Sequence, residues 1–263
     1  MRAPCLLLLS ILIALPSLAG TAYIPFVAED LPGADAGRST TVDVEIYNQG
    51  TVGRRYAVSF VRAGEDGSQG GTFLRTDAQA PGTARTLTCC DGGSGMLIVS
   101  GAPQIAFTVH LNEVFNQPSP NMVSLRLPLV TAADALPAGS HASLQRLVWE
   151  FGDSVTSSVG IVNLGHHPAH CTGSGISFPA QFPDLQSIDV PPVSVAAVPH
   201  ALHGPVVQGG TPITFFEQRP TFTCDQPFYP FALVYWGLLG ASLPVGLPWV
   251  EFVPPTIPLG NVP

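Results

Sequence analysis

The sequence predicts an all-β protein with two tandem β-sandwich domains, and three observations favour this fold class. Gly and Pro contribute 27 residues each, a mixture that suits many short strands joined by turns and disfavours long helices. In several segments apolar residues alternate with small or polar ones, which is the period of a half-buried strand. The most regular of these segments occurs twice in the chain.

The repeated segment is an apolar strand that ends at an Asn-x-Gly turn. Its copies are DVEIYNQG at residues 43–50 and SVGIVNLG at residues 158–165. Asn and Gly tolerate the left-handed backbone that a tight turn requires. Two further pairs of segments are loosely similar, 57–60 with 175–178 and 80–82 with 190–192. A repeat at a separation of about 110 residues predicts two similar domains in tandem.

Residues 1–19 have the pattern of a secretory signal peptide. Arg2 supplies the positive charge, residues 6–14 form an apolar run too short to span a bilayer, and Ser17 and Ala19 are small residues where a signal peptidase reads the chain. We expect cleavage after Ala19 or within two residues of it. The mature protein is then secreted or on the cell surface, in an extracellular or periplasmic compartment.

The strand pattern divides the mature chain into a first domain at 20–131 and a second at 142–263. A connector that contains Pro137 and Gly139 lies between them. Each unit closes on an apolar segment with an internal proline, at 127–130 and at 252–255. The expected strands are 23–27, 41–47, 55–61, 72–76, 85–88, 96–99, 105–114 and 122–130 in the first unit, and 144–151, 158–163, 187–198, 213–216, 231–236 and 249–253 in the second.

The stretch 228–250 contains no charged residue, which is also typical of a membrane span. Three prolines, Pro230, Pro244 and Pro248, divide it into pieces. Its position in the second unit matches that of 107–130 in the first. We therefore expect two buried strands around a loop and no membrane span, with contact between this stretch and a membrane as the alternative.

The charge of the chain excludes some partners. The sequence contains no Lys, and once Arg2 has left with the signal nine Arg face 18 Asp and Glu. No cluster of basic residues is present. Nucleic acid and anionic membrane surfaces are therefore not expected as partners.

The mature chain retains four cysteines, Cys89, Cys90, Cys171 and Cys224. Thiols in an exported protein are usually bridged, and four of them allow three pairings. Two of the pairings need bonds between domains, so we expect a disulfide between Cys171 and Cys224 within the second domain. Its loop of about 50 residues gives about 3–4 kcal/mol in the chain-entropy picture. Cys89 and Cys90 are then either bridged to each other or free.

The segment 41–51, TVDVEIYNQGT, resembles the strand and turn of immunoglobulin-like repeats in secreted bacterial proteins, including the CARDB-type adhesion modules. The wider arrangement is similar to that of uncharacterised tandem-domain secreted bacterial proteins. The second copy departs from the pattern, with Leu164 inside its turn and a His-rich loop after it. The resemblance implies immunoglobulin-like sandwiches of seven strands and an extracellular role. It implies no catalytic residues and no cofactor.

Ser154, within Gly152-Asp153-Ser154, is the first candidate for chemistry, because several hydrolases place their nucleophile in this tripeptide. A serine hydrolase also needs a positioned base and an oxyanion hole. Val155 and Thr156 replace the two glycines that a trypsin-like serine would have after it, and the tripeptide coincides with an expected turn. We assign no catalytic residue.

A second candidate is a metal site at His166, His167 and His170, beside Cys171. Imidazole and sulfur are ligands for zinc or copper, and His200 and His203 could add to them. The spacing matches no established metal motif, so we expect an exposed loop without a metal. Acidic loop residues are candidate calcium ligands, although solvated charge is the expected role, and the tryptophans are a candidate sugar platform, although core packing is the expected role. The residues concerned are Glu29, Asp30, Asp35, Glu65, Asp66, Trp149, Trp236 and Trp249.

These observations favour a non-enzymatic extracellular module with an adhesion, scaffold or surface-structural role, whose partner is a protein or glycan at the cell surface. A glycan-binding module is the alternative, followed by a secreted hydrolase or metal-binding protein. Fold alone does not choose between these classes, because β-sandwiches support unrelated functions.

Overall fold

The computed structural model describes residues 20–27, 38–90, 93–115, 121–150, 155–174, 186–199, 201, 206–208, 211–213, 215–236 and 249–257. Among these residues every regular element is a strand, and all of the strand pairs are antiparallel. The predicted all-β fold class is confirmed. The expected signal peptide, residues 1–19, lies outside the described part.

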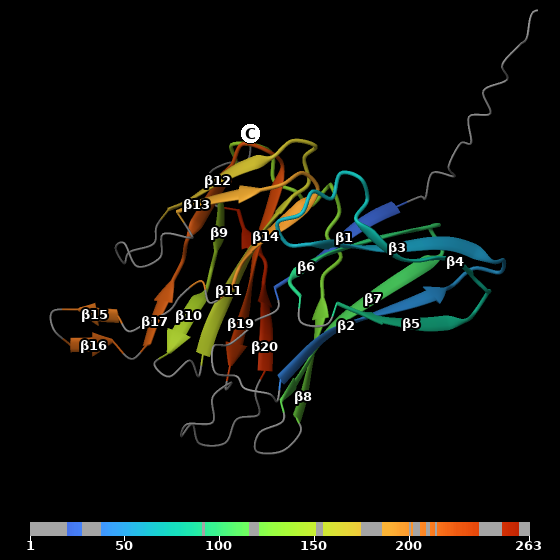
Figure 1. Ribbon diagram of the computed structural model, residues 1–263, viewed down its shortest axis with the longest axis horizontal. Helices are drawn as coiled ribbons and strands as arrows, with labels where there is room; N and C mark the ends of the chain where they lie inside the picture. Colours follow the sequence, from blue (N-terminus) through green and yellow to red (C-terminus); the bar gives the residue numbers. More distant parts are fainter. Residues whose placement is uncertain are drawn as a thin grey trace, which may run out of the picture.

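The first half of the chain forms two four-stranded sheets, in the orders β1-β6-β3-β4 and β5-β2-β7-β8 (Figure 1). Their apolar residues alternate as expected for a sandwich. On β2, for example, Val42, Val44 and Ile46 are fully buried, whereas Glu45 and Tyr47 between and beyond them are exposed. The strands are β1 (Gly20–Phe26), β2 (Arg38–Asn48), β3 (Arg54–Arg62), β4 (Thr72–Gln79), β5 (Ala84–Cys89), β6 (Gly95–Gly101), β7 (Ile105–Phe115) and β8 (Asn121–Leu127).

The second half forms a five-stranded sheet, β13-β12-β18-β9-β21, and a four-stranded sheet, β14-β11-β19-β20. Two short pairs, β10-β17 and β15-β16, complete it. The strands are β9 (Ala142–Leu144), β10 (Leu147–Glu150), β11 (Val155–Asn163), β12 (Ala169–Ser174), β13 (Ser187–Val190), β14 (Ser194–Val198), β15 (Val206–Gln208), β16 (Thr211–Ile213), β17 (Phe215–Gln218), β18 (Thr221–Cys224), β19 (Phe228–Trp236), β20 (Trp249–Val253) and β21 (Pro255–Thr256).

The two halves have the same sheet order. The sheet β5-β2-β7-β8 corresponds to β14-β11-β19-β20, so β2 and β11, which end at Asn48 and Asn163, occupy equivalent places. Each half also closes in the same way. After β8 and Pro128 the chain crosses to β1, where Val130 forms a bridge with Tyr23; after β20 and Pro254, β21 pairs with β9.

Two long expected strands are each divided between two sheets, and the short one expected at 213–216 covers the end of β16 and the start of β17. The predicted strand 144–151 is divided into β9 and β10, which belong to different sheets. The predicted strand 187–198 is likewise divided into β13 and β14. Pro191 and Pro192 lie between these two strands, followed by Val193 with a φ of +46°. A proline pair and a left-handed residue interrupt a ladder, so the chain passes from one sheet to the other at this point.

The sheet β14-β11-β19-β20 is apolar on both faces. On β19, Phe228, Ala232 and Val234 belong to the core of the second half. The alternate residues Phe231, Leu233 and Tyr235 pack with the first half in a second, continuous cluster that includes Ile24 and Met96. Both faces of this strand are thus covered by protein. This explains why the stretch that begins at residue 228 has no charges and no polar alternation.

Among the described residues, side-chain and backbone hydrogen bonds cross between the halves. The buried hydroxyl of Tyr235 donates to the carbonyl of Val27 at 2.6 Å. The backbone N–H groups of Gly64 and Gly67 donate to the carbonyls of Val195 and Pro192, at 2.9 and 3.0 Å. The halves are therefore held by directional contacts as well as by apolar burial.

The connector between the halves is hydrogen-bonded to both of them. Val130 exchanges backbone hydrogen bonds with Tyr23 on β1, at 2.7 and 2.8 Å, and Leu136 does so with Phe228 on β19, at 2.8 and 3.0 Å. Asp134 stabilises the turn between them by accepting from the backbone N–H and the hydroxyl of Thr131. Within the described residues, no helix is long and apolar enough to cross a membrane.

Candidate functional site

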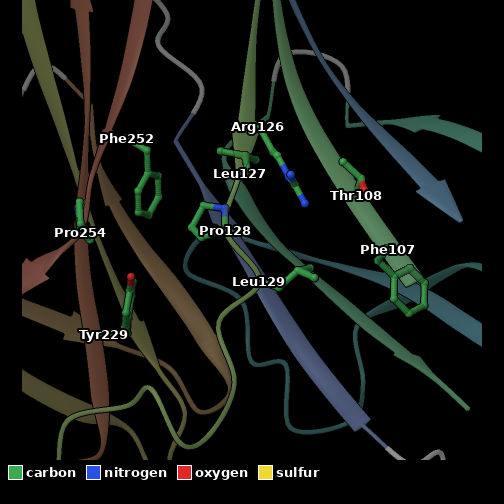
Figure 2. Close-up of a pocket in the computed structure, with 9 residues that line it drawn as sticks. All are labelled: Phe107, Thr108, Arg126, Leu127, Pro128, Leu129, Tyr229, Phe252 and Pro254. Atoms are coloured by element: carbon green, nitrogen blue, oxygen red, sulfur yellow. The ribbon is translucent and has the colours of Figure 1, made fainter. Parts of the chain in front are cut away.

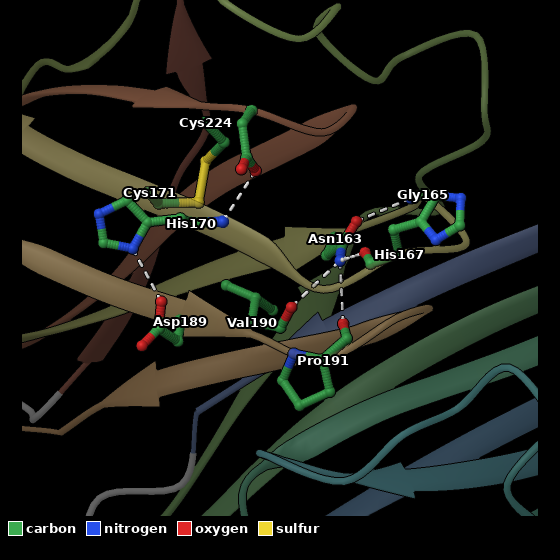
Figure 3. The surroundings of a disulfide bond; sticks show 10 residues. Asn163, Gly165, His167, His170, Cys171, Asp189, Val190, Pro191 and Cys224 are labelled. Atoms are coloured by element: carbon green, nitrogen blue, oxygen red, sulfur yellow. Dashed lines mark hydrogen bonds and ion pairs between the residues drawn. A yellow bond between two sulfur atoms is a disulfide. The ribbon is translucent and has the colours of Figure 1, made fainter.

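The two repeated asparagines are buried and make the same contacts (Figure 3 shows the second copy). Asn163 accepts a hydrogen bond from the N–H of Gly165 at 2.8 Å, and its amide donates to the carbonyls of His167, Val190 and Pro191, at 2.8 to 3.1 Å. The side chain thus joins the turn after β11 to the end of β13. Its hydrogen bonds satisfy backbone N–H and C=O groups that have no backbone partner in a tight turn.

The first copy repeats this arrangement around Asn48. Its side-chain oxygen accepts from the N–H of Gly50 at 2.9 Å, and its amide donates to the carbonyls of Val52 and Gln79, at 2.9 and 2.8 Å. Gln79 is the last residue of β4, as Val190 is the last residue of β13. The repeated asparagine therefore has a structural role in each half, because it joins the turn to the end of a strand in the other sheet.

Replacing Asn163 by Ala is expected to lower the free energy of unfolding by about 2–3 kcal/mol, because the two amide N–H donors shared among three carbonyls and the acceptor of the Gly165 N–H are lost from a buried side chain. Urea denaturation followed by tryptophan fluorescence measures this loss. Asn112→Ala is the matched control, because the amide of Asn112 donates a single side-chain hydrogen bond among the described residues, to the carboxylate of Asp43. An effect of Asn163→Ala no larger than that of the control would contradict the assignment.

Cys171 and Cys224 form a disulfide between neighbouring strands, with their Cα atoms 4.1 Å apart (Figure 3). Both residues are buried in the core of the second half. Cys171 is the third residue of β12 and Cys224 the last of β18. In the first half the equivalent pair, in the same register between β3 and β6, is Tyr56 and Gly101.

The three histidines proposed as weak metal ligands lie on or beside the turn after β11, and all are exposed. His170 contacts Asp189 through Nδ1, at 2.8 Å (Figure 3), and its backbone N–H donates to Asp225. In the described part of the chain, no group of three His, Cys, Asp or Glu side chains could hold a metal ion. His200 and His203 lie outside the described residues.

Cys89 and Cys90 are joined to each other in a disulfide between adjacent residues at the end of β5. Both are half-buried, and Cys90 has a φ of +69°, in the left-handed region. The alternatives left open by the sequence, a bridge or two thiols, are thus resolved in favour of the bridge.

Several other candidates cannot be placed. Ser154, with the rest of its tripeptide, and the acidic residues Glu29, Asp30 and Asp35 lie outside the described residues. The tryptophans are described only in their backbone, where Trp236 lies opposite Trp249 and Trp149 opposite Phe216. In the acidic pair Glu65 and Asp66, Asp66 accepts a hydrogen bond from the N–H of Ser68 at 2.8 Å. This bond lowers the pKa of Asp66 and gives the residue a structural role in the turn.

The outer face of the sheet β5-β2-β7-β8 carries a row of polar side chains. The carboxylate of Asp43 accepts hydrogen bonds from Thr88 on β5 and from Asn112 on β7. On the neighbouring strands His110 contacts Ser124 through Nδ1, at 3.4 Å. Serine, histidine and aspartate therefore share one face, but the contact between His110 and Ser124 is long for a hydrogen bond. These hydrogen bonds link β5, β2, β7 and β8 across the sheet surface.

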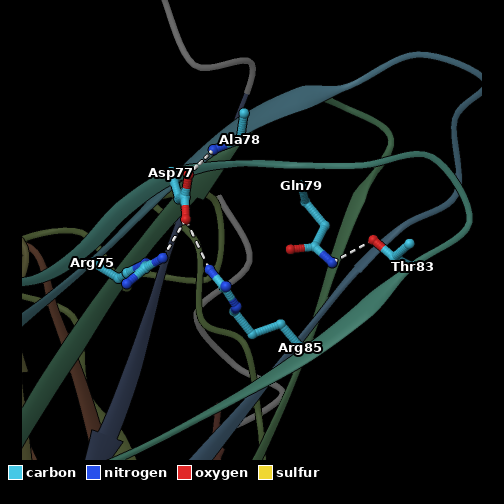
Figure 4. Close-up of polar contacts among 6 residues, drawn as sticks. All are labelled: Arg75, Asp77, Ala78, Gln79, Thr83 and Arg85. Atoms are coloured by element: carbon cyan, nitrogen blue, oxygen red, sulfur yellow. Dashed lines mark hydrogen bonds and ion pairs between the residues drawn. The ribbon is translucent and has the colours of Figure 1, made fainter.

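Asp77 joins the edge strands of the two sheets of the first half (Figure 4). Its carboxylate pairs with Arg75 on β4 and, at 2.8 Å, with Arg85 on β5. The hydrogen bond from Arg75, followed by those from the N–H of Ala78 and from Arg85, lowers the pKa of Asp77 to about 2. All three side chains are exposed, and each charge has a partner, so this cluster is a surface link between sheets.

The feature that sequence reasoning missed is a groove between the two halves, with a volume of about 560 Å³ (Figure 2). One side is formed by β7, β8 and the start of the connector, and the other by β19, β20 and Pro254. The lining residues are Phe107, Thr108, Arg126, Leu127, Pro128, Leu129, Tyr229, Phe252 and Pro254. The closing segments 127–130 and 252–255, which are similar in sequence, thus face each other across it. Their similarity was visible in the sequence, but their proximity was not.

The groove is apolar except for three side chains, Thr108, Arg126 and Tyr229. Arg126 is exposed, and among the described residues it is the one charged side chain that lines the groove. Tyr229 is 9% exposed, and its pKa is raised to about 12 by burial and, to a smaller extent, by the nearby charge of Asp134. The phenol therefore stays protonated at neutral pH and can donate a hydrogen bond.

Comparison with models of protein families, with curated proteins and with solved structures found no match.

Proposed function

We propose that this chain is an exported, non-enzymatic module with an adhesion, scaffold or surface-structural role, related to the immunoglobulin-like repeats that its turn motif resembles. The observation that carries the proposal is the junction between the halves. Two sandwiches with equivalent sheet orders share one apolar cluster, and their connector is hydrogen-bonded to both. A body of this kind can hold two attached surfaces at a constant separation, which a scaffold requires.

The two disulfides support a place outside the cytoplasm. Both disulfides, one buried and one between adjacent residues, need an oxidising compartment to form and persist. The charged residues described around the histidine turn and at Asp77 serve turns and strand edges, so they add no argument for catalysis.

Localisation is tested with the full chain carrying a C-terminal epitope tag, produced in its own cells. We expect the tagged protein outside the cytoplasm, with an N-terminus within about two residues of Gly20 because the small residues before it suit signal peptidase. N-terminal sequencing and fractionation measure both. Cytoplasmic protein that retains residues 1–19 would contradict the proposal.

The non-enzymatic part of the proposal is tested with the secreted protein against ester, peptide and glycoside substrates. We expect no turnover that differs between the unmodified protein and Ser154→Ala, because no base and oxyanion hole are assigned to Ser154. Ser124→Ala serves as the matched control on the outer sheet face. Turnover that is lost in Ser154→Ala and kept in Ser124→Ala would overturn it.

A further inference from the structure

The disulfide between Cys89 and Cys90 lies where the chain leaves one sheet of the first half for the other. Cys89 is the last residue of the edge strand β5, and Gly95 is the first residue of β6 in the opposite sheet (Figure 1). Both cysteines are half-buried, and both pack against the apolar cluster that the two halves share. The bridge is therefore accessible from solvent although it lies beside the core.

The backbone of Cys90 has a conformation that a cysteine does not favour. Its φ is +69°, in the left-handed region, where the Cβ atom of a non-glycine residue crowds the backbone. The ladder between β5 and β2 stops at the pair Cys89 and Val42, whereas β2 continues to Arg38 along β7. In this register the next pair would be Cys90 and Thr41, and the left-handed backbone of Cys90 prevents it.

The two disulfides differ in exposure and in loop length. Cys171 is 0% exposed and Cys224 is 2% exposed, and both lie in the core of the second half. A thiolate must reach a sulfur atom to exchange with it, so burial protects this bridge in the folded protein. Its sequence separation is 53 residues, against one for Cys89 and Cys90. Opening the adjacent bridge therefore releases almost no loop entropy in the unfolded chain.

We propose that Cys89 and Cys90 form a reversible redox site, at which a dithiol reductant opens the bridge in the folded protein while Cys171 and Cys224 remain bridged. One thiolate of the reductant attacks a sulfur of the bridge, the S–S bond breaks, and the other cysteine leaves as a thiolate. The second thiol of the reductant then attacks the mixed disulfide. Two electrons and two protons thus pass to the cysteines, and the reductant becomes a cyclic disulfide.

The adjacency of the two cysteines selects a dithiol. After the first exchange, the freed cysteine is one residue from the mixed disulfide and expels a monothiol before a second molecule arrives. Once both thiols are free, the backbone of Cys90 adopts the extended conformation and pairs with Thr41, so that β5 becomes longer. This redox site goes beyond the adhesion or scaffold role proposed above and does not depend on it.

Alkylation of the secreted protein tests the opening of the bridge. Dithiothreitol is added without denaturant, free thiols are blocked with iodoacetamide, and mass spectrometry of the peptides identifies the modified cysteines. We expect Cys89 and Cys90 to be modified at least about tenfold faster than Cys171 and Cys224, because the second pair is buried. Glutathione at the same thiol concentration should leave both bridges closed, and oxidised dithiothreitol should restore the first one.

Hydrogen exchange tests the change in β5. Reduction should raise the protection of the amides at the end of β5 and of β2 near Thr41, because new ladder hydrogen bonds form there. Cys89→Ala combined with Cys90→Val should reproduce this protection, since valine favours the extended backbone. Cys89→Ala combined with Cys90→Gly is the matched control, because glycine keeps the left-handed conformation accessible and should not gain the protection.

Each part of the proposal has a result that contradicts it. Selective opening is wrong if both pairs are alkylated at the same rate, or if Cys89 and Cys90 react only when the protein unfolds. Their alkylation before any reductant is added would show that the bridge is absent. Reduction by glutathione as complete as that by dithiothreitol would overturn the choice of a dithiol. Unchanged protection of β5 and β2 after reduction would overturn the lengthening of β5.

Discussion

Replacing Cys171 and Cys224 together by Ala is expected to lower the free energy of unfolding by about 3–4 kcal/mol. The bond closes a loop with a sequence separation of 53 residues, so its loss releases chain entropy in the unfolded state. The double substitution also removes two buried sulfur atoms from the core between β12 and β18. Urea denaturation of the double variant, followed by circular dichroism in the far ultraviolet, measures the loss.

The chain contains its own control for this experiment. Cys89 and Cys90 are adjacent, so their disulfide closes almost no loop, and the pair is half-buried. Replacing both by Ala should cost less than about 1 kcal/mol in the same entropic picture. Two results would show that loop closure is not the source of the stabilisation. One is an equally large loss in the Cys89 and Cys90 variant. The other is a loss below about 1 kcal/mol in the Cys171 and Cys224 variant.

Replacing Phe231 by Ala is expected to lower the free energy of unfolding by about 3–5 kcal/mol, because it leaves a large cavity at the junction of the halves. The ring is fully buried, stacks on Phe252 with centroids 5.5 Å apart, and covers Gly160, where an added Cβ would lie 2.2 Å from it. Thermal unfolding followed by circular dichroism measures the change in stability.

The place where hydrogen-exchange protection is lost distinguishes a residue at the junction of the halves from a residue in the core of one half. Phe228→Ala is the matched variant, because Phe228 is equally buried on the same strand but belongs to the core of the second half. In hydrogen exchange, Phe231→Ala should reduce protection in β1 and β6 of the first half, whereas Phe228→Ala should not. Equal protection of β1 and β6 in the two variants would contradict the coupling of the halves through this sheet.

The repeat was readable from the sequence because both copies serve the same local purpose. Asn48 and Asn163 each complete a tight turn with their own side chain, and this requirement is local enough to preserve the residue type and its spacing to a glycine. The equivalent sheet orders follow the same repeat. The copy proposed at 175–178 lies outside the described residues.

The extent of two strands was predicted less well. A run of apolar residues such as 187–198 has no signal that says which sheet each part joins, and only the pairing partners of β13 and β14 separate them. The proline pair between them was visible, and it marks the crossing once the sheets are known.

By itself the sequence determined the all-β class, because the alternation of apolar residues and the frequency of turn residues are local properties of the chain. It also located the two asparagine turns, for the same reason. Tertiary structure alone decided what covers the second face of β19, since a strand that is apolar on both faces looks the same whether protein or lipid surrounds it. The formation of the groove likewise depends on tertiary structure. Arg126 and Tyr229 lie about a hundred residues apart in the sequence, and only the packing of one half on the other brings them to one groove.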